Sequence, residues 1–197
     1  MNYESVRPDH KAILGIITSR SSVLDLGCGT GELLYLLIKE KNVRAQGIEI
    51  DEQAIYKCVA KGLNVFHGDI DSGLREYKDK SFDYVILNQS LQQVKHVESV
   101  LTDALRVGKK VIVGFPNFAY FGARFQLFFK GRAPITPSLP YTWYSTPNLH
   151  FLSITDFIEY ARKNKINIER SVFFDNKRRI IVLPNLLANI GIFLISI

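Results

Sequence analysis

The sequence predicts an α/β protein in which one domain, residues 1–197, is built on a doubly wound, mostly parallel sheet. Short and nearly continuous apolar runs alternate with helix-length segments through the first two-thirds of the chain, as expected when helices cover both faces of a parallel sheet. A glycine-rich turn follows the first apolar run, and an acidic residue ends the second. This arrangement is typical of open sheets that bind an adenine cofactor at their carboxyl edge.

The expected elements alternate in order along the chain. A leading helix, His10–Thr18, precedes five strands and three helices: strand Ser22–Leu26, helix Gly31–Lys39, strand Ala45–Ile50, helix Asp51–Lys61, strand Leu63–His67, strand Phe82–Leu87, helix Leu91–Val107 and strand Lys110–Phe115. Asp51 is the expected N-cap of the helix that begins there. Gly108 is expected to end the helix Leu91–Val107.

This alternation stops at residues 115–151. The segment holds 11 of the chain's Phe, Tyr and Trp residues and five of its seven prolines, so we expect an ordered insert rather than a linker. Its first part predicts an amphipathic helix near Phe118–Phe129, and a proline-fixed loop follows through Tyr144. Beyond it we expect a helix over Thr155–Lys163 and an antiparallel pair of strands, Ile166–Phe174 and Gly191–Ile197, at the end of the sheet.

The composition argues against nucleic-acid binding, metal binding and membrane insertion. The net charge of +6 allows an anionic partner, but the basic residues are scattered and the densest cluster, Lys177–Arg179, is three residues long, so no nucleic-acid partner is expected. Two cysteines and four histidines lack metal-ligand spacing, which predicts no metal site and a reducing, cytoplasmic environment. No signal peptide is evident, and Pro184 and Gly191 interrupt the apolar C-terminal stretch, so no membrane segment is predicted.

The glycine-rich turn discriminates among cofactors. Gly27, Gly29 and Gly31 run G-x-G-x-G, which is one position shorter than the dinucleotide pattern. Asp25 and Glu32 flank the turn, and two carboxylates there would repel a pyrophosphate. S-adenosylmethionine (SAM) has no phosphate and carries a sulfonium and an ammonium, so the sequence favours SAM, with NAD a distant alternative. The plain alternative is that these glycines only tighten a strand-to-helix turn.

Further cofactor contacts are expected after the second and third strands. Glu49, 18 residues after Gly31, has the acceptor capacity for both ribose hydroxyls. Ile50 is a candidate for packing on the adenine face, although it reads equally well as an ordinary apolar residue. Asp69 is a candidate acceptor for the adenine amino group; the alternative is a turn aspartate.

The residues after the fourth strand are candidates for the reaction centre. Asn88 and Gln89 lie at the carboxyl edge of the sheet, where they would line the methyl-transfer site or merely cap the next helix. Asn88 is also a candidate cofactor contact. Cys28 lies in the turn at a helix start and is expected to contact the cofactor, but as a small space-filling residue rather than a reactive thiolate. No arrangement typical of nucleophilic catalysis is present.

The insert offers candidate substrate contacts. It combines aromatic rings with a few cations, which fits a pocket for a small molecule bearing a carboxylate or phosphate, and equally fits a protein-docking surface. The candidate substrate residues are Arg124, Tyr141, Trp143, Tyr144 and His150.

These motifs together resemble the class I SAM-dependent methyltransferases, and more closely the MetW family of methionine biosynthesis proteins. The superfamily resemblance rests on Val23–Leu34, Gly47–Asp51, and Phe82–Leu87 followed by Gln89–Gln92. The segments specific to the family are Val113–Phe118, Gly131–Pro134 and Leu139–His150.

The resemblance implies a Rossmann-like sheet of seven strands whose last strand is antiparallel. It also implies SAM contacts at Asp25, Gly27, Gly29, Glu49 and Asp69, and a role in methionine synthesis beside homoserine O-acetyltransferase. Thr30 departs from the family pattern, in which Asp is common, but Thr is frequent in related methyltransferases.

Two functions follow as hypotheses. The chain is a methyltransferase for a small, anionic acceptor, or it is a SAM-binding regulatory partner of homoserine O-acetyltransferase without turnover of its own. The absence of an evident general base is compatible with the first, because carboxylate or thiolate acceptors need none.

Overall fold

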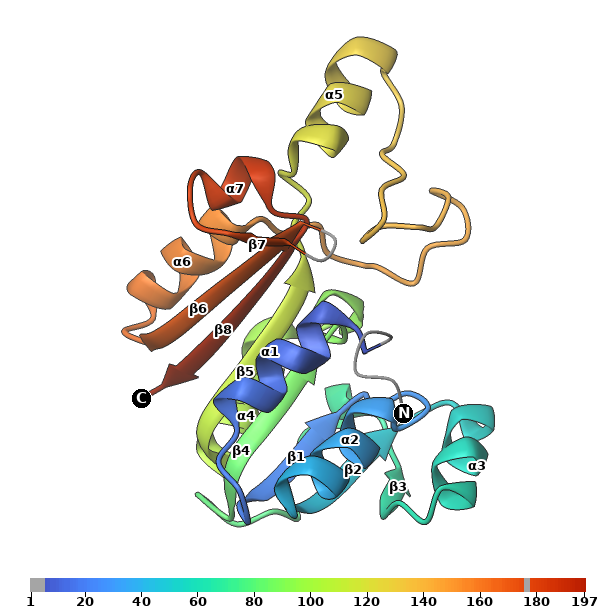
Figure 1. The fold of residues 1–197 in the computed structure, drawn as a ribbon, viewed down its shortest axis with the longest axis vertical. Helices are drawn as coiled ribbons and strands as arrows, with labels where there is room; N and C mark the ends of the chain where they lie inside the picture. The colour runs from blue at the N-terminus through green and yellow to red at the C-terminus, as the bar shows by residue number, and fades with distance from the viewer. Residues whose placement is uncertain (1–5, 176–177) are drawn as a thin grey trace.

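The computed structural model describes residues 6–175 and 178–197, so Lys177 of the basic cluster lies outside the described residues. The described strands form one sheet in the order β3-β2-β1-β4-β5-β8-β6-β7 (Figure 1). Their bounds are β1 Ser22–Leu26, β2 Arg44–Glu49, β3 Val65–His67, β4 Phe82–Asn88, β5 Gly108–Pro116, β6 Asn167–Asp175, β7 Arg178–Ile180 and β8 Ile190–Ser196.

The helices agree with the expected positions to within a few residues, apart from the long helix, the insert and the short α7, which was not expected. Their bounds are α1 Pro8–Ile16, α2 Glu32–Lys41, α3 Glu52–Ala60, α4 Val97–Val107, α5 Phe121–Lys130, α6 Ile154–Lys163 and α7 Pro184–Leu187, with short 3-10 turns at η2 Ile70–Ser72 and η3 Leu91–Gln93. The Asp51 side chain accepts a hydrogen bond from the Gln53 N–H, which confirms Asp51 as the N-cap of α3.

The sheet topology confirms the predicted fold class. Strands β1 to β5 pair in parallel, and β8, the last strand, runs antiparallel between β5 and β6. The described residues contain eight strands rather than seven, because the three-residue β7 pairs antiparallel with β6. The order places the carboxyl ends of β1, β2 and β4 side by side, which positions the loops that follow them around one site.

Successive side chains of the central strands point alternately into two hydrophobic cores, one on each face of the sheet. Val23 and Ile86 pack with α1 and α2 on one face, and Leu24 and Val85 pack with α4 and α6 on the other. Helices therefore cover both faces, as the apolar runs of the strands predict.

The expected helix Leu91–Val107 is interrupted, and this prediction was wrong. The chain forms the short turn η3 and then restarts as α4 at Val97. The Asp71 carboxylate causes the interruption: it accepts hydrogen bonds from the Lys95 N–H at 2.8 Å and from the His96 N–H at 2.9 Å. These bonds to a distant loop satisfy the amides at the start of α4.

The insert between β5 and α6 carries α5 away from the rest of the molecule (Figure 1). Its helix begins at Phe121, three residues later than expected, because the buried Asn117 organises the preceding turn and accepts from the Ala119 N–H. The segment that returns from α5 is tied to η3, where the Gln92 carbonyl oxygen accepts from the Leu149 and His150 N–H groups at 2.9 and 3.0 Å.

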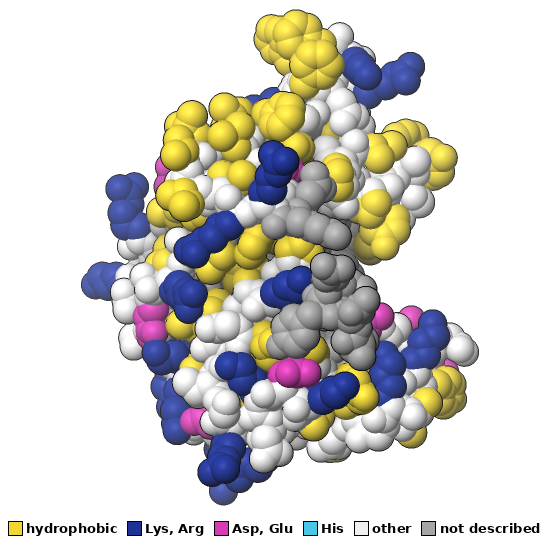
Figure 2. Space-filling view, in the orientation of Figure 1, with side chains coloured by type: hydrophobic (Ala, Val, Ile, Leu, Met, Phe, Trp, Pro, Cys, Tyr) yellow, Lys and Arg dark blue, Asp and Glu magenta, His cyan; other side chains and the backbone are white. Residues whose placement is uncertain are grey.

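Hydrophobic side chains gather on the surface of α5 (Figure 2). Phe128 is 83% exposed and Phe129 is 69% exposed, and Ala123 is the buried residue of the helix. The whole insert, residues 115–151, contains no aspartate or glutamate, while Arg124, Lys130 and Arg132 supply positive charge. The α5 part of the insert is therefore an apolar and basic projection, while the start of the insert at Phe115 belongs to the core.

Candidate functional site

A cavity of about 630 Å³ opens at the carboxyl ends of the parallel strands. Loops after four strands line it, with Gly29 following β1, Glu49 at the end of β2, Asp69 following β3 and Asn88 at the end of β4. The first turn of α1 closes one side. The sheet order thus brings together candidate residues that are far apart in the sequence.

The glycine-rich turn forms one wall of this cavity. Gly29 has a positive φ of 56°, and a β-carbon added there would meet no atom within 4 Å, so the backbone faces open space. Gly27 also lines the cavity. Gly31 does not: a β-carbon there would lie 2.3 Å from Leu63 Cδ1, so this glycine is required for packing of α2 against α3.

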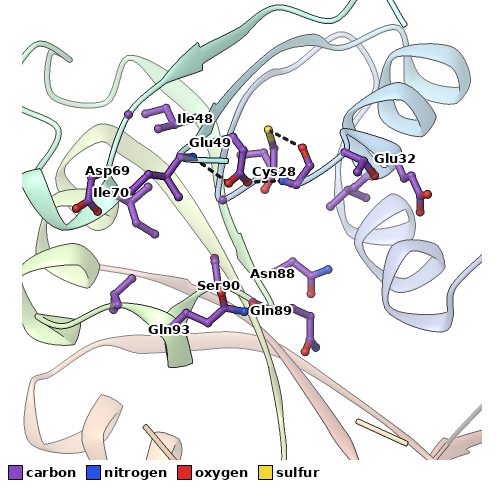
Figure 3. Close-up of a pocket in the computed structure, with 18 of the residues that line it drawn as sticks. Cys28, Glu32, Ile48, Glu49, Asp69, Ile70, Asn88, Gln89, Ser90 and Gln93 are labelled. Atoms are coloured by element: carbon purple, nitrogen blue, oxygen red, sulfur yellow. Dashed lines mark hydrogen bonds between the residues drawn. The ribbon is translucent and has the colours of Figure 1, made fainter. Parts of the chain in front are cut away.

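Glu49 is buried and bonded to the backbone around it (Figure 3). Its Oε2 accepts from the Gly29 N–H at 2.7 Å, and its Oε1 accepts from the N–H groups of Ile50 and Asp51 at 2.8 and 3.0 Å. A carboxylate offers about four acceptor positions, so these bonds fix its orientation and leave part of its capacity for a ligand.

Asp25 is the most strongly perturbed carboxyl group of the cavity. It is 3% exposed, and burial followed by the nearby Glu49 charge raises its pKa to about 7. Among the described residues none donates a hydrogen bond to it, so its ionised form has no stabilising partner. A ligand cation next to this group would supply one.

Cys28 lines the same wall without the character of a nucleophile. Burial, then the negative charge of Asp25, raises the pKa of its thiol far above the ordinary value. The Cys28 Sγ and the Gly29 carbonyl oxygen are 3.9 Å apart. That Cys28 only fills space beside the cofactor stays a prediction.

Ile50 and Asp69 lie at the mouth of the cavity. Ile50 is 59% exposed, which is unusual for an isoleucine at the end of a buried strand. Asp69 caps the η2 turn by accepting from the Asp71 N–H at 2.9 Å, so the turn-forming interpretation of Asp69 describes its present contacts. Both side chains are free to contact a ligand that enters from this end.

Polar side chains at the end of β4 lie across the cavity from the glycine turn (Figure 3). Asn88 Oδ1, Gln89 Nε2 and Ser90 Oγ are buried and have no hydrogen-bond partner. Gln89 also has a positive φ of 63°, and its carbonyl oxygen accepts from the side chains of Gln92 and Gln93. Asn88 Oδ1 lies against Gly114 of β5, where an added β-carbon would be 2.2 Å from it, so this atom is turned to the neighbouring strand.

The first turn of α1 contributes residues that the sequence did not indicate. Asp9, 1% exposed, accepts from Asn88 Nδ2 at 2.9 Å and from Arg7 Nε and Nη2 at 3.1 and 2.5 Å. Burial alone would raise the Asp9 pKa, but the charges of Arg7 and His10 and these hydrogen bonds lower it. Arg7 and His10 line the cavity. The only sequence signal was a cluster of charged residues around Pro8.

The structure disperses the candidate substrate residues of the insert. Tyr141 lines the main cavity, and with Trp143 it also lines a separate cavity of about 280 Å³. His150 lines a third cavity of about 430 Å³ beside α4 and α6. Tyr144 is exposed against Trp143, with ring centroids 5.5 Å apart, and the exposed Arg124 bonds to the Ala119 carbonyl oxygen. Tyr141 is therefore the one of these five residues that reaches the main cavity.

The described part of the chain contains neither of two other kinds of site. No group of three or more His, Cys, Asp or Glu residues is arranged to hold a metal ion there. None of the described helices has the length and apolar character needed to cross a membrane.

Comparison with known sequences decides the family. The model of the family described as "Methionine biosynthesis protein MetW" matches residues 7–195. The chain belongs to this family. A MetW-containing relative from Rhodopirellula baltica, named "Bifunctional methionine biosynthesis protein MetXA/MetW", is 37% identical over 176 residues. The match covers 85% of this chain but 28% of the relative, so the chain spans less than a third of that protein's length.

Solved structures confirm the methyltransferase fold of this MetW-family chain. A SAM-dependent methyltransferase from Archaeoglobus fulgidus has a TM-score of 0.72 at 15% identity, with 96% of this chain and 91% of that chain covered. A SAM-dependent methyltransferase from Thermotoga maritima, described as a possible histamine N-methyltransferase, has a TM-score of 0.67 at 18% identity over 96% of this chain and 87% of that one. Such similarity establishes the fold and leaves the ligands to be argued from the site.

Proposed function

We propose that this MetW-family protein binds SAM in the main cavity and transfers a methyl group to a small, anionic acceptor. The observation that carries the proposal is the pairing of two buried carboxyl groups, Asp25 and Glu49, with an open glycine backbone at Gly29. A cationic, phosphate-free cofactor fits this wall, whereas a pyrophosphate would meet negative charge.

Each wall has a distinct task in this proposal. The remaining acceptor capacity of Glu49 receives the ribose hydroxyls, Ile50 packs on the adenine, and Asp69 accepts from its amino group. Asp25 balances positive charge at the methionine end, and Asn88 and Gln89 line the reaction centre.

The first task of the protein in this chemistry is to position the two reactants. SAM, when bound, supplies a methyl group on a sulfonium that is already a good leaving group. The chain's residues hold the acceptor within reach, roughly 3–3.5 Å from the methyl carbon, and exclude water. Tyr141 is the insert residue that contacts this cavity and is the candidate for acceptor binding.

Calorimetric titration with SAM, S-adenosylhomocysteine and NAD tests the cofactor. We expect binding of the first two and none of NAD. Glu49→Ala should weaken SAM about tenfold to a hundredfold because hydrogen bonds to a charged group are lost. Glu52→Ala, which removes an exposed carboxylate of α3 outside the cavity, is the matched control. Unchanged affinity in Glu49→Ala would contradict the assignment.

A second function is favoured by the relative from Rhodopirellula baltica. Its name joins MetXA and MetW in one chain, and the exposed Phe128 and Phe129 of α5 provide an unpaired apolar surface here. The protein would then bind SAM without turnover and regulate homoserine O-acetyltransferase by docking through the insert. Both functions place it in the cytoplasm.

Co-elution with homoserine O-acetyltransferase in size-exclusion chromatography tests this second function. We expect a complex whose stability changes with SAM and which Phe128→Ser with Phe129→Ser disrupts. Glu52→Ala again serves as the control. No complex in either the presence or the absence of SAM would remove the support for regulation by docking.

A further inference from the structure

His10 is a buried histidine with an unusual lack of partners. It is 7% exposed, lies in the first turn of α1 and lines the main cavity. The other histidines, His67, His96 and His150, are exposed, and none of them lines this cavity. No described residue forms a hydrogen bond to the His10 side chain. Its ring nitrogens are not among the buried atoms that lack a partner, so they are accessible from the cavity and can bond to a ligand there.

The opposite wall of the cavity, at the end of β4, also carries polar side chains. Ser90 is 7% exposed, and its Oγ lacks a partner, as does the buried Gln89 Nε2. Gln89 and Ser90 line the cavity from the end of β4, and His10 lines it from α1. Together they define a place for a polar ligand group between the two walls.

The position of α1 indicates that His10 lies at the end of the cavity where the methyl acceptor would bind. The adenosine contacts of the proposed function involve Glu49 and Asp69, which follow β2 and β3. Helix α1 instead lies against α2 and is latched to β4 through the bond from Asn88 Nδ2 to Asp9 Oδ2. His10, the next residue, therefore lies at the end of the cavity that the adenosine half does not fill.

We propose that His10 is the catalytic base of the methyl transfer, and that the methylated atom of the acceptor is one that carries a proton, such as an amine, hydroxyl or imidazole nitrogen. This inference rests on the proposed function. The lone pair of the attacking atom forms the bond to the methyl carbon, and the carbon–sulfur bond breaks with its electron pair left on sulfur. The proton of the attacking atom passes to an imidazole nitrogen of His10 and then to water.

The charges around His10 keep it suitable for this role. Burial, the largest effect, lowers the His10 pKa, and the Arg7 charge lowers it further, while Asp9 and Glu32 act in the opposite direction. The imidazole is therefore neutral near pH 7 and has a free nitrogen lone pair. A neutral histidine is the usual general base at this pH.

Sinefungin provides a probe, because it carries an amino group where SAM carries the methyl group. In the wild-type protein we expect His10 to accept a hydrogen bond from this amino group. His10→Leu should weaken sinefungin binding about tenfold while changing the affinity for S-adenosylhomocysteine less than about twofold, since a lost hydrogen bond to a charged group has this size. His10→Gln should restore part of the loss. His67→Leu, an exposed histidine outside the cavity, should change neither affinity.

Equal weakening of both ligands in His10→Leu would overturn the inference, because it would mark His10 as a structural residue. No change for either ligand would overturn it as well. If the wild-type protein binds neither ligand, the proposed function fails, and this inference fails with it.

A measurement on the wild-type protein covers the case in which His10→Leu does not fold. The His10 imidazole is titrated by NMR in complexes with SAM and with S-adenosylhomocysteine. The nearby sulfonium charge should lower the His10 pKa in the SAM complex relative to the other complex. Equal pKa values in the two complexes would contradict the placement of His10 at the reaction centre.

Discussion

Replacing Asp25 with asparagine is predicted to remove a pH dependence of stability that the wild-type protein carries. The Asp25 carboxyl group is 3% exposed, receives no hydrogen bond from the described residues and lies near the Glu49 charge, and its pKa is raised to about 7. In the unfolded chain it titrates at the ordinary value of 3.8. The folded protein therefore holds a proton that the unfolded chain has lost across the intervening pH range.

The sign and size of the effect follow from this difference. Because the folded state binds more protons, the free energy of unfolding decreases as the pH rises through this range. Over the full shift the change is about 4 kcal/mol, and from about pH 5.5 to about pH 8 it is about 2 kcal/mol, complete soon after the pH passes the folded pKa. Asp25→Asn mimics the neutral form at every pH and should be the more stable protein in alkaline solution.

Urea unfolding followed by circular dichroism measures this difference. The informative quantity is the free energy of unfolding of the wild type minus that of Asp25→Asn, since groups common to both cancel. It should fall by about 2 kcal/mol between about pH 5.5 and about pH 8. A difference that stays constant across this range would refute the argument that Asp25 is buried without compensation. Glu52→Gln, an exposed carboxyl change, should show no such trend.

Three further predictions concern the turn, the sheet and the core. Gly31→Ala should lower stability by about 2–4 kcal/mol, because the positive φ adds to the displacement of the Leu63 and Cys58 side chains. Gly29→Ala has open space but a positive φ, so it should lower stability by only about 1 kcal/mol in thermal unfolding while weakening SAM binding in calorimetry. Asp83 has its pKa lowered to about 2 by bonds from Lys109 and from Ser22, so stability should fall as the pH drops from about 4 toward 2, and Asp83→Asn should flatten that decline in acid unfolding curves. Phe193→Ala should cost about 3–5 kcal/mol in urea unfolding because this ring is fully buried in the aromatic core.

The sheet could be predicted because its signals are local. The strands around Leu24 and Val85 are apolar on both faces, and the turn at Gly29 follows directly after one of them. The break in the expected helix Leu91–Val107 could not be predicted, because it depends on the Asp71 carboxylate some 20 residues earlier in the chain. Hydrogen bonds between distant segments leave no periodicity in the sequence.

Some residues of the candidate site could likewise be predicted from the sequence, and others could not. Glu49 and Asp69 could be proposed from their places after strands, which the sheet topology then brings to one cavity. Arg7 and His10 could not, since their contribution depends on the bond between Asp9 and Asn88, 79 residues apart. The aromatic composition of the insert predicted an apolar, ordered segment, but composition does not specify which ring reaches which cavity.

The return segment of the insert touches two places at once. Its Leu149 and His150 amides bond to the Gln92 carbonyl oxygen, and the Gln92 side chain in turn donates to the Gln89 carbonyl oxygen at the cavity wall. A molecule that binds the insert and a molecule that binds in the cavity therefore both act on this chain of hydrogen bonds through Gln92. If each favours a particular arrangement of that path, thermodynamic reciprocity requires that each alter the affinity of the other by the same factor. The coupling between α5 and the cavity is the ratio of the dissociation constants of one ligand measured with and without the other ligand bound. The ratio has the same value for either ligand.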